Sequence, residues 1–146
     1  MGPLLAFHRH FLAADAVKEV MFAPIAHAAE TDLPAEVVEL AQVWSSMLRM
    51  QVFYALMYVV IEGYRALKFE DEAVDLLLKN DAMVESFRRF RNAIFHFQKD
   101  PLSPKLVEFL QADGSEKWAQ ELHAAFRAFF LRVLPIQEFK NELKRT

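Results

Sequence analysis

A helical pattern runs without interruption from Asp32 to Phe69 and limits what this chain can fold into. At 1.5 Å per residue, one helix of that length would be about 54 Å long. A compact domain of this chain length has a radius of gyration of only about 15 Å. The helix must therefore kink, break or project beyond its domain. Ser45-Ser46 is the first expected site of a bend, and Gly63 is the second.

The rest of the chain also alternates between helical patterns and short breaks that contain proline, glycine or polar residues. This predicts an all-α fold: a single helical domain over residues 1–146, built as an up-and-down bundle of four to six helices. The expected N-caps are Asp32, Asp71 or Glu70, Asn80 or Asp81, and Ser115. The further helices are expected over Pro3–Phe22, 71–78, Asp81–Phe97, 105–111 and Ser115–Val133, with residues 135–146 as a frayed C-terminal helix.

Apolar residues make up 54% of the chain, which is above the usual share and more than one small domain is expected to hide. This excess favours an oligomer. The most apolar run, Val52–Ile61, is about half as long as a membrane span, so we expect a buried central helix and no membrane contact. A face used for dimerisation would give the same pattern. Trp44, Tyr54, Tyr58 and Tyr64 are expected to pack in the core or at its edge.

Composition and spacing exclude several classes of site. The net charge is −3, so affinity for nucleic acid would require a local patch of positive charge. There is no cysteine, zinc motif or glycine-rich phosphate loop, and we expect a cytoplasmic protein without a signal peptide. His27 and Glu30 are spaced to share a metal, but no second such pair exists, so we expect no metal and no cofactor. His123 and Arg127 share one face of the last predicted helix and are interpreted as ordinary surface residues.

One stretch has residues suited to chemistry: Arg91-Asn92-Ala93-Ile94-Phe95-His96, late in the predicted helix Asp81–Phe97. On a helix, the apolar side of this region is a core stripe of Met83, Phe87, Phe90, Ile94 and Phe97, with Ala93 at its edge. The opposite side carries Arg88, Arg89, Asn92, His96 and Lys99, with Glu85 among them and Arg91 at the border. We therefore expect a cationic groove around His96 that is open to solvent; the alternative is an ordinary solvated face with positive charge.

These side chains suit cleavage of a phosphodiester without a metal. Histidine titrates near neutral pH and can move the proton of a 2′-hydroxyl, so His96 is the candidate general base or acid. The planar guanidinium of Arg91 suits phosphate oxygens and would stabilise the charge that grows on phosphorus. Asn92 would orient the imidazole or bind a ribose or phosphate oxygen. The residues expected to bind the RNA backbone are Arg88, Arg89 and Lys99.

The pattern Arg-Asn-x-x-x-His, late in a helix of an all-helical chain, resembles the signature of the HEPN superfamily. Arg91, Asn92 and His96 match that signature position for position. The resemblance implies a homodimeric helical bundle in which two motifs face each other across one composite cleft. It also implies a metal-independent endoribonuclease of the toxin–antitoxin, phage-defence or RNA-processing type. An antitoxin or a nucleotidyltransferase-like protein is the partner that the resemblance suggests.

Other interpretations stay open. The chain is alternatively a non-catalytic helical module for dimerisation or partner binding, in which Arg91 and His96 bind acidic groups of a partner. Some proteins of the HEPN superfamily are antitoxin-like or bind nucleotides, and that is a third interpretation. Glu62 either pairs with Arg91 and orients it, or is an ordinary surface carboxylate. Phe95 either stacks on a base or packs against a dimer partner.

Overall fold

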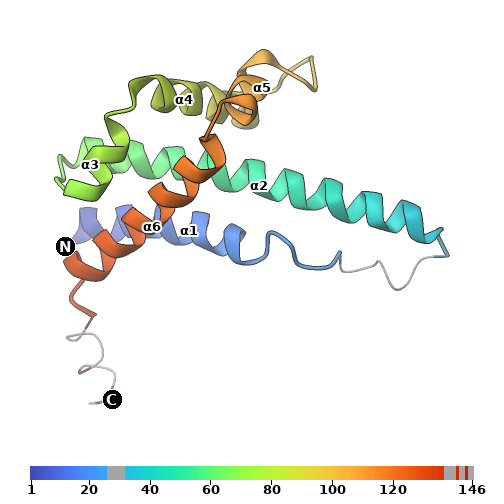
Figure 1. The fold of residues 1–146 in the computed structure, drawn as a ribbon. Helices are drawn as coiled ribbons and strands as arrows, with labels where there is room; N and C mark the ends of the chain where they lie inside the picture. The colour runs from blue at the N-terminus through green and yellow to red at the C-terminus, as the bar shows by residue number, and fades with distance from the viewer. Residues whose placement is uncertain (26–31, 137–140, 142–143, 145–146) are drawn as a thin grey trace.

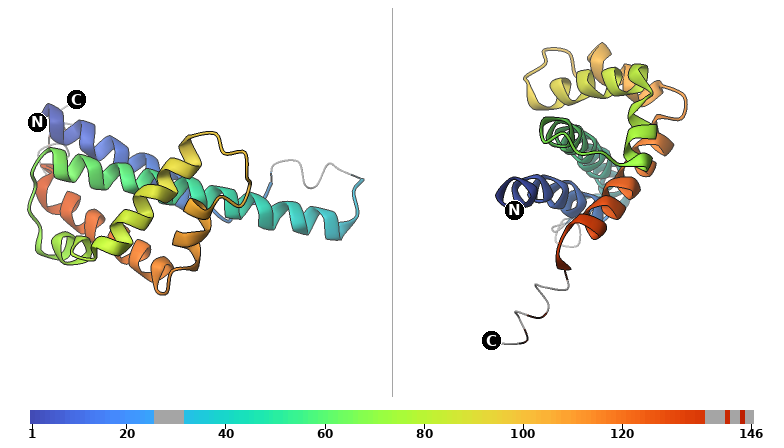
Figure 2. Two further views of the ribbon diagram at one scale, coloured as in Figure 1. Left: turned by 90° about the horizontal axis from the view of Figure 1, so that it is seen from above. Right: turned by 90° about the vertical axis from the view of Figure 1, so that its left-hand side faces the viewer.

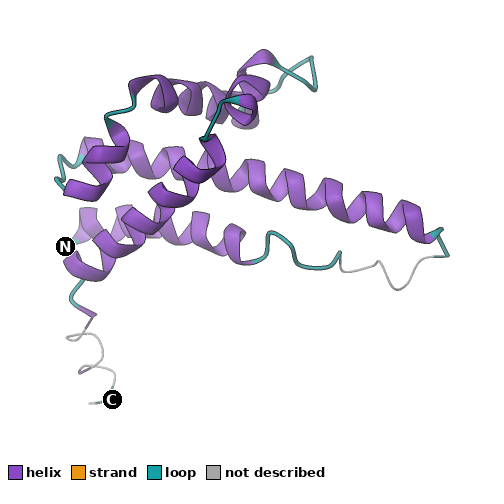
Figure 3. Cartoon of the chain, viewed as in Figure 1, coloured by secondary structure: helices purple, strands orange, loops and turns teal. Residues whose placement is uncertain are grey.

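The computed structural model describes residues 1–25, 32–136, 141 and 144, and this part of the chain contains six helices and no strand (Figure 1, Figure 3). The predicted all-α helical bundle is confirmed. The helices are α1 (Gly2–Glu19), α2 (Ala35–Ala66), α3 (Glu72–Leu78), α4 (Asp81–Phe95), α5 (Pro104–Gln111) and α6 (Ser115–Val133). His27, Glu30 and most of the predicted helix over 135–146 lie outside the described residues.

The long predicted helix is a single element, α2, which has 32 residues and is about 48 Å long. It runs without interruption through both expected bend sites, Ser45-Ser46 and Gly63, so of the three possibilities it projects. The C-terminal half of α2 is buried among the other helices, whereas the N-terminal half extends beyond them (Figure 1, Figure 2). Pro34 takes the N-cap position of α2, so the N-cap predicted at Asp32 is wrong.

By length and composition alone, α2 also qualifies as a helix that could cross a membrane, with a mean hydropathy of 1.2 over an 18-residue window. Within that window, 39% is buried inside the described structure. The core helix of a soluble protein passes the same test, so this is weak support for a membrane span.

The other helices surround the buried half of α2. α1 runs antiparallel beside it, and α4 packs on it and carries α5 (Figure 2). α6 crosses its flank, with Phe126 against Tyr64, and packs on α3. In the end-on view of Figure 2, α2 lies between α1 and α4, with α3 and α6 to one side. This arrangement places the C-terminal end of α4, which carries the motif, beside the middle of α2.

The core consists largely of aromatic side chains that several helices contribute. The phenylalanines with 0–2% of their surface exposed are Phe7, Phe53, Phe87, Phe90, Phe109, Phe126, Phe129 and Phe130. The prediction that Tyr54, Tyr58 and Tyr64 pack in the core is confirmed, because all three are buried. Trp44 was expected there too, but it is 60% exposed because it lies on the projecting half of α2.

Local capping explains where the short elements begin. Asp71 and Asn80 cap α3 and α4 as predicted. Their side-chain oxygens accept hydrogen bonds from the backbone N–H three residues later, at 3.0 and 3.2 Å. The N-cap predicted at Ser115 is wrong, because Gly114 precedes α6 in the left-handed conformation, with φ +72°, and Ser115 is already helical.

α1 ends at Glu19, three residues before the predicted end at Phe22. The chain after it is held against α2 by Arg49, whose Nη1 donates to the carbonyls of Val20 and Ala23 at 2.8 and 2.7 Å. These bonds give two carbonyls beyond the helix end a partner from another helix. A tertiary contact of this kind has no local sequence signal.

α1 packs tightly on α2 at Gly63. A Cβ atom at this position would lie 2.7 Å from Cδ2 of Phe7. The Phe7 ring is itself surrounded by the rings of Phe69, Phe126, Phe129 and Phe130. Gly63 therefore permits close packing of two helices, and it does not mark a bend.

We predict that Gly63→Ala destabilises the chain. Overpacking of a tight core costs about 1–3 kcal/mol, whereas the gain in helix propensity is at most about 1 kcal/mol. Urea unfolding measures the difference. In a Phe7→Leu background the same substitution should cost less or become stabilising, because the ring edge is gone. If Gly63→Ala changed the free energy of unfolding equally in both backgrounds, the close contact between Gly63 and Phe7 would be contradicted.

Candidate functional site

α4 presents the motif at its C-terminal end. Its inner face packs on α2 and α5 through Phe87 and Phe90, which have no exposed surface. The helix ends at Phe95, and His96 is the C-cap residue in an extended conformation, with φ −115° and ψ 140°. The predicted helix therefore extended two residues too far.

The earlier end of α4 changes the place of Phe97. This residue was predicted to complete the core stripe, but it is 90% exposed. Because the backbone is extended at His96, Phe97 leaves the line of the helical face. The rest of the stripe is as predicted, since Met83 and Ala93 are buried and Ile94 packs partly buried against the core.

Arg91 is held by an ion pair with α2. Its Nη1 and Nη2 donate to the two carboxylate oxygens of Glu62 at 3.2 and 2.9 Å. The guanidinium carbon lies 5.0 Å from the ring centroid of Tyr58, and the Arg91 side chain is 22% exposed. Burial, and then the charge of Glu62, raise the pKa of Tyr58. Of the two possibilities for Glu62, the structure has the pair with Arg91.

The other arginines of the motif helix are also paired with carboxylates. Arg88 Nη2 lies 2.6 Å from Glu85, one turn earlier, and this contact lowers the pKa of Glu85. Arg89 Nη1 lies 2.6 Å from Glu108 of α5. Lys99 is exposed and forms no ion pair with the described residues. Carboxylates therefore offset much of the positive charge predicted on this face.

Sequence reasoning missed the partners of Arg88 and Arg89. Glu85 precedes Arg88 by three residues, and that spacing places the two side chains on one helix face, so this pair could have been found. Glu108 lies on another helix, 19 residues after Arg89. Only the packing of α4 on α5 brings those two together.

His96 borders a pocket of about 450 Å³ at the end of α4. One wall comes from Leu48, Gln51 and Val52 of α2, and the rest comes from the last turn of α4, the segment that follows it and Leu106 of α5. The His96 side chain is exposed and makes no hydrogen bond to the part of the chain that the structure describes. Arg91 and Asn92 do not line this pocket.

Within a single chain, Arg91 and His96 lie against different parts of α2. Arg91 binds Glu62, whereas His96 shares its pocket with Val52. These two positions of α2 are ten residues apart, about 15 Å at the helical rise. Asn92 is partly buried, and its carbonyl accepts a hydrogen bond from the backbone N–H of His96 at 3.0 Å. Its side chain has no hydrogen-bond partner among the described residues.

An apolar surface adjoins the His96 pocket along the projecting half of α2. We call it the α2 stripe, and it consists of Val37, Leu40, Trp44, Met47, Leu48 and Val52. These side chains are 45, 69, 60, 40, 45 and 37% exposed. The first four recur at intervals of three and four residues, which is the spacing of a helix that packs against another helix. Phe95 and Phe97, 47% and 90% exposed, stand at the same end of α4.

A second histidine differs from its prediction. His123 was interpreted as a surface residue, but it is 5% exposed, and its Nε2 lies 2.8 Å from Oδ1 of Asp15 on α1. The two residues are 108 positions apart in the chain, so no local pattern could have paired them.

The search for a metal site among the described residues and the comparisons with known proteins were both negative. Within the described ranges, no three His, Cys, Asp or Glu side chains are grouped so that they could hold a metal ion. Comparison of the chain with protein families, curated proteins and solved structures found no match.

We predict that Arg91 and Glu62 are coupled energetically. A double-mutant cycle of Arg91→Ala and Glu62→Ala, measured by urea unfolding, should give a coupling of about 0.5–1 kcal/mol. Added salt should reduce it. The Arg88–Glu85 pair is a matched control that is more exposed and should couple more weakly. Strict additivity for Arg91 and Glu62 would show that the pair does not hold the guanidinium.

Proposed function

We propose that this chain is a metal-independent endoribonuclease of the HEPN type that acts as a homodimer. His96 serves as general base or acid, Arg91 as the phosphate clamp, and Asn92 orients them. The residues that bind the RNA backbone are Arg88, Arg89 and Lys99. One observation carries the proposal: His96 is exposed in a pocket whose wall is continuous with the α2 stripe.

The α2 stripe is large enough to pair with a second copy of the chain. A fully buried aromatic side chain covers about 150–250 Å². Scaled by the exposed fractions above, the stripe with Phe95 and Phe97 offers an apolar area on the order of 800 Å², close to what one partner contributes to a stable interface. Monomers rarely expose apolar patches of this size. The helical spacing of the stripe suits the same helix of a symmetry-related chain.

Such pairing would complete the cleft. Leu48 and Val52 belong both to the α2 stripe and to the wall of the His96 pocket, so a second chain on the stripe would also border the pocket. Within one chain, Arg91 and His96 are directed to separate points on α2. In a two-fold dimer, His96 of one chain and Arg91 of the other can face the same phosphate.

The Arg91–Glu62 pair is compatible with phosphate binding. Each Nη atom of arginine has two N–H groups, and Glu62 uses one on each. The second N–H of each Nη atom is left to bind a phosphate while Glu62 and Tyr58 fix the plane of the guanidinium, whereas Nε is buried without a partner among the described residues. An oriented donor of this kind stabilises transition-state charge better than a mobile one.

A second candidate is a non-catalytic module for dimerisation or partner binding, including an antitoxin-like or nucleotide-binding protein. It is favoured by the pairing of Arg88, Arg89 and Arg91 with carboxylates of the same chain. In this case the α2 stripe would still bind a second copy, but the motif would bind no RNA.

We predict that the purified chain cleaves single-stranded RNA in the presence of EDTA. His96→Ala and Arg91→Ala should each reduce the rate by about 100-fold or more, since general acid–base groups and charge stabilisers contribute effects of that size. The matched controls are His10→Ala and Arg9→Ala, an exposed histidine and arginine of α1, which should leave the rate unchanged.

The competing outcomes are distinct. Cleavage that His96→Ala and Arg91→Ala leave unchanged would show that the motif is not the active site. A dimeric wild type that cleaves none of the RNAs offered would favour the non-catalytic candidate.

A further inference from the structure

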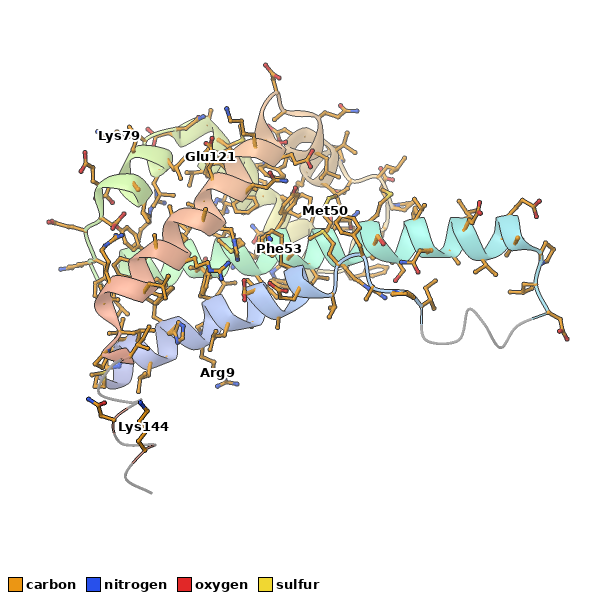
Figure 4. The ribbon with its side chains drawn as sticks, turned by 60° about the horizontal axis from the view of Figure 1, so that its bottom comes forward. Arg9, Met50, Phe53, Lys79, Glu121 and Lys144 are labelled. Carbon is orange, nitrogen blue, oxygen red and sulfur yellow. The ribbon has the colours of Figure 1, made fainter. Side chains whose placement is uncertain are left out.

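A second hollow lies on the other side of α2 from the motif, where α1, α2 and α6 meet. Its volume is about 600 Å³, within the range of about 300–1,000 Å³ typical of small-molecule sites. Figure 4 labels Met50 and Phe53, two of the α2 residues that line it; Met21, which follows the end of α1, lines it as well. Methionine side chains adapt to ligands of varied shape, so this floor suits a flexible or irregular apolar body.

One wall of the hollow is the buried His123, which is held rigidly. Its Nε2 lies 2.8 Å from the Asp15 carboxylate, and its ring packs against Phe11 and Phe53 at centroid distances of 5.2 and 5.6 Å. A carboxylate only accepts hydrogen bonds, so Nε2 carries a proton and Nδ1 of the neutral ring is an acceptor. No described residue donates to Nδ1, although His123 lines the hollow.

The rim of the hollow carries positive charge. Lys18 of α1 and Arg127 of α6 both line it, and both are exposed. Neither forms an ion pair with the described residues. Burial lowers the pKa of His123, and the charges of Lys18 and Arg127 lower it further, against the opposing effect of Asp15. The charges of Lys18 and Arg127 therefore make the electrostatic potential beside the imidazole of His123 more positive.

We propose that this hollow binds an apolar carboxylate, such as a medium-chain fatty acid. The chain of the ligand lies among Met21, Met50 and Phe53, and its acid group lies between Lys18 and Arg127. A monoanion fits better than a polyphosphate, because Glu116 also lines the hollow and would repel a highly charged ligand. This site is independent of the proposed nuclease function, since it uses none of the motif residues.

The test uses the full chain and two probes. Anilinonaphthalene sulfonate, an aromatic anion, should bind saturably with one strong site per chain, and decanoate should displace it. Arg127→Glu should weaken both probes about tenfold or more, which is the effect of losing one hydrogen bond to a charged group. Ala124→Trp, which fills the hollow from α6 without changing its charge, should weaken both as well.

Controls separate this site from the α2 stripe. Lys117→Glu reverses an exposed charge on α6 outside the hollow and should leave binding unchanged. Circular dichroism and thermal melting confirm that each variant is folded. The proposal is overturned if the wild type shows no saturable binding. It is also overturned if binding survives Arg127→Glu and Ala124→Trp but is lost in Trp44→Glu, which would assign the probes to the α2 stripe.

Discussion

The packing of aromatic side chains around the C-terminal half of α2 holds this fold together. Phe7 from α1 lies against the backbone of α2 at Gly63, and Phe87, Phe109 and Phe126 bring α4, α5 and α6 into the same core. The N-terminal half of the same helix has no such cover. Because α2 is continuous, the buried half fixes the direction of the exposed half and projects its apolar stripe away from the bundle.

The sequence predicted what depends on local periodicity and capping. The all-helical fold, the caps at Asp71 and Asn80 and the buried face of α4 follow from spacing within one helix. For Trp44, Phe97 and His123, the prediction of whether the side chain is buried or exposed was wrong. Whether an apolar or titratable side chain is covered depends on residues far along the chain, or on where a helix ends, and neither is visible in a local pattern.

The charge balance of the candidate site was also not predictable from local sequence patterns. The arginines of α4 were predicted to form a positive field, and all three are present on the expected helix. Two of the three, Arg89 and Arg91, are paired with carboxylates from other helices, Glu108 and Glu62. Helix periodicity therefore located the three arginines but not the carboxylates that balance their charge. Arg91 and His96 lie apart within one chain. In the proposed cleft, Arg91 comes from one chain and His96 from the other, so the two can act together.

The proposed two-chain cleft requires a second copy of the chain on the α2 stripe. Sedimentation velocity tests this dimerisation most directly. We expect the full chain to sediment as a dimer at micromolar concentration. The double variant Leu40→Glu with Trp44→Glu should sediment as a monomer with unchanged helical circular dichroism. Leu131→Glu on α6, where the leucine is 62% exposed, should remain dimeric. A monomeric wild type at about 100 µM, or a stripe variant that remains dimeric, would contradict the account.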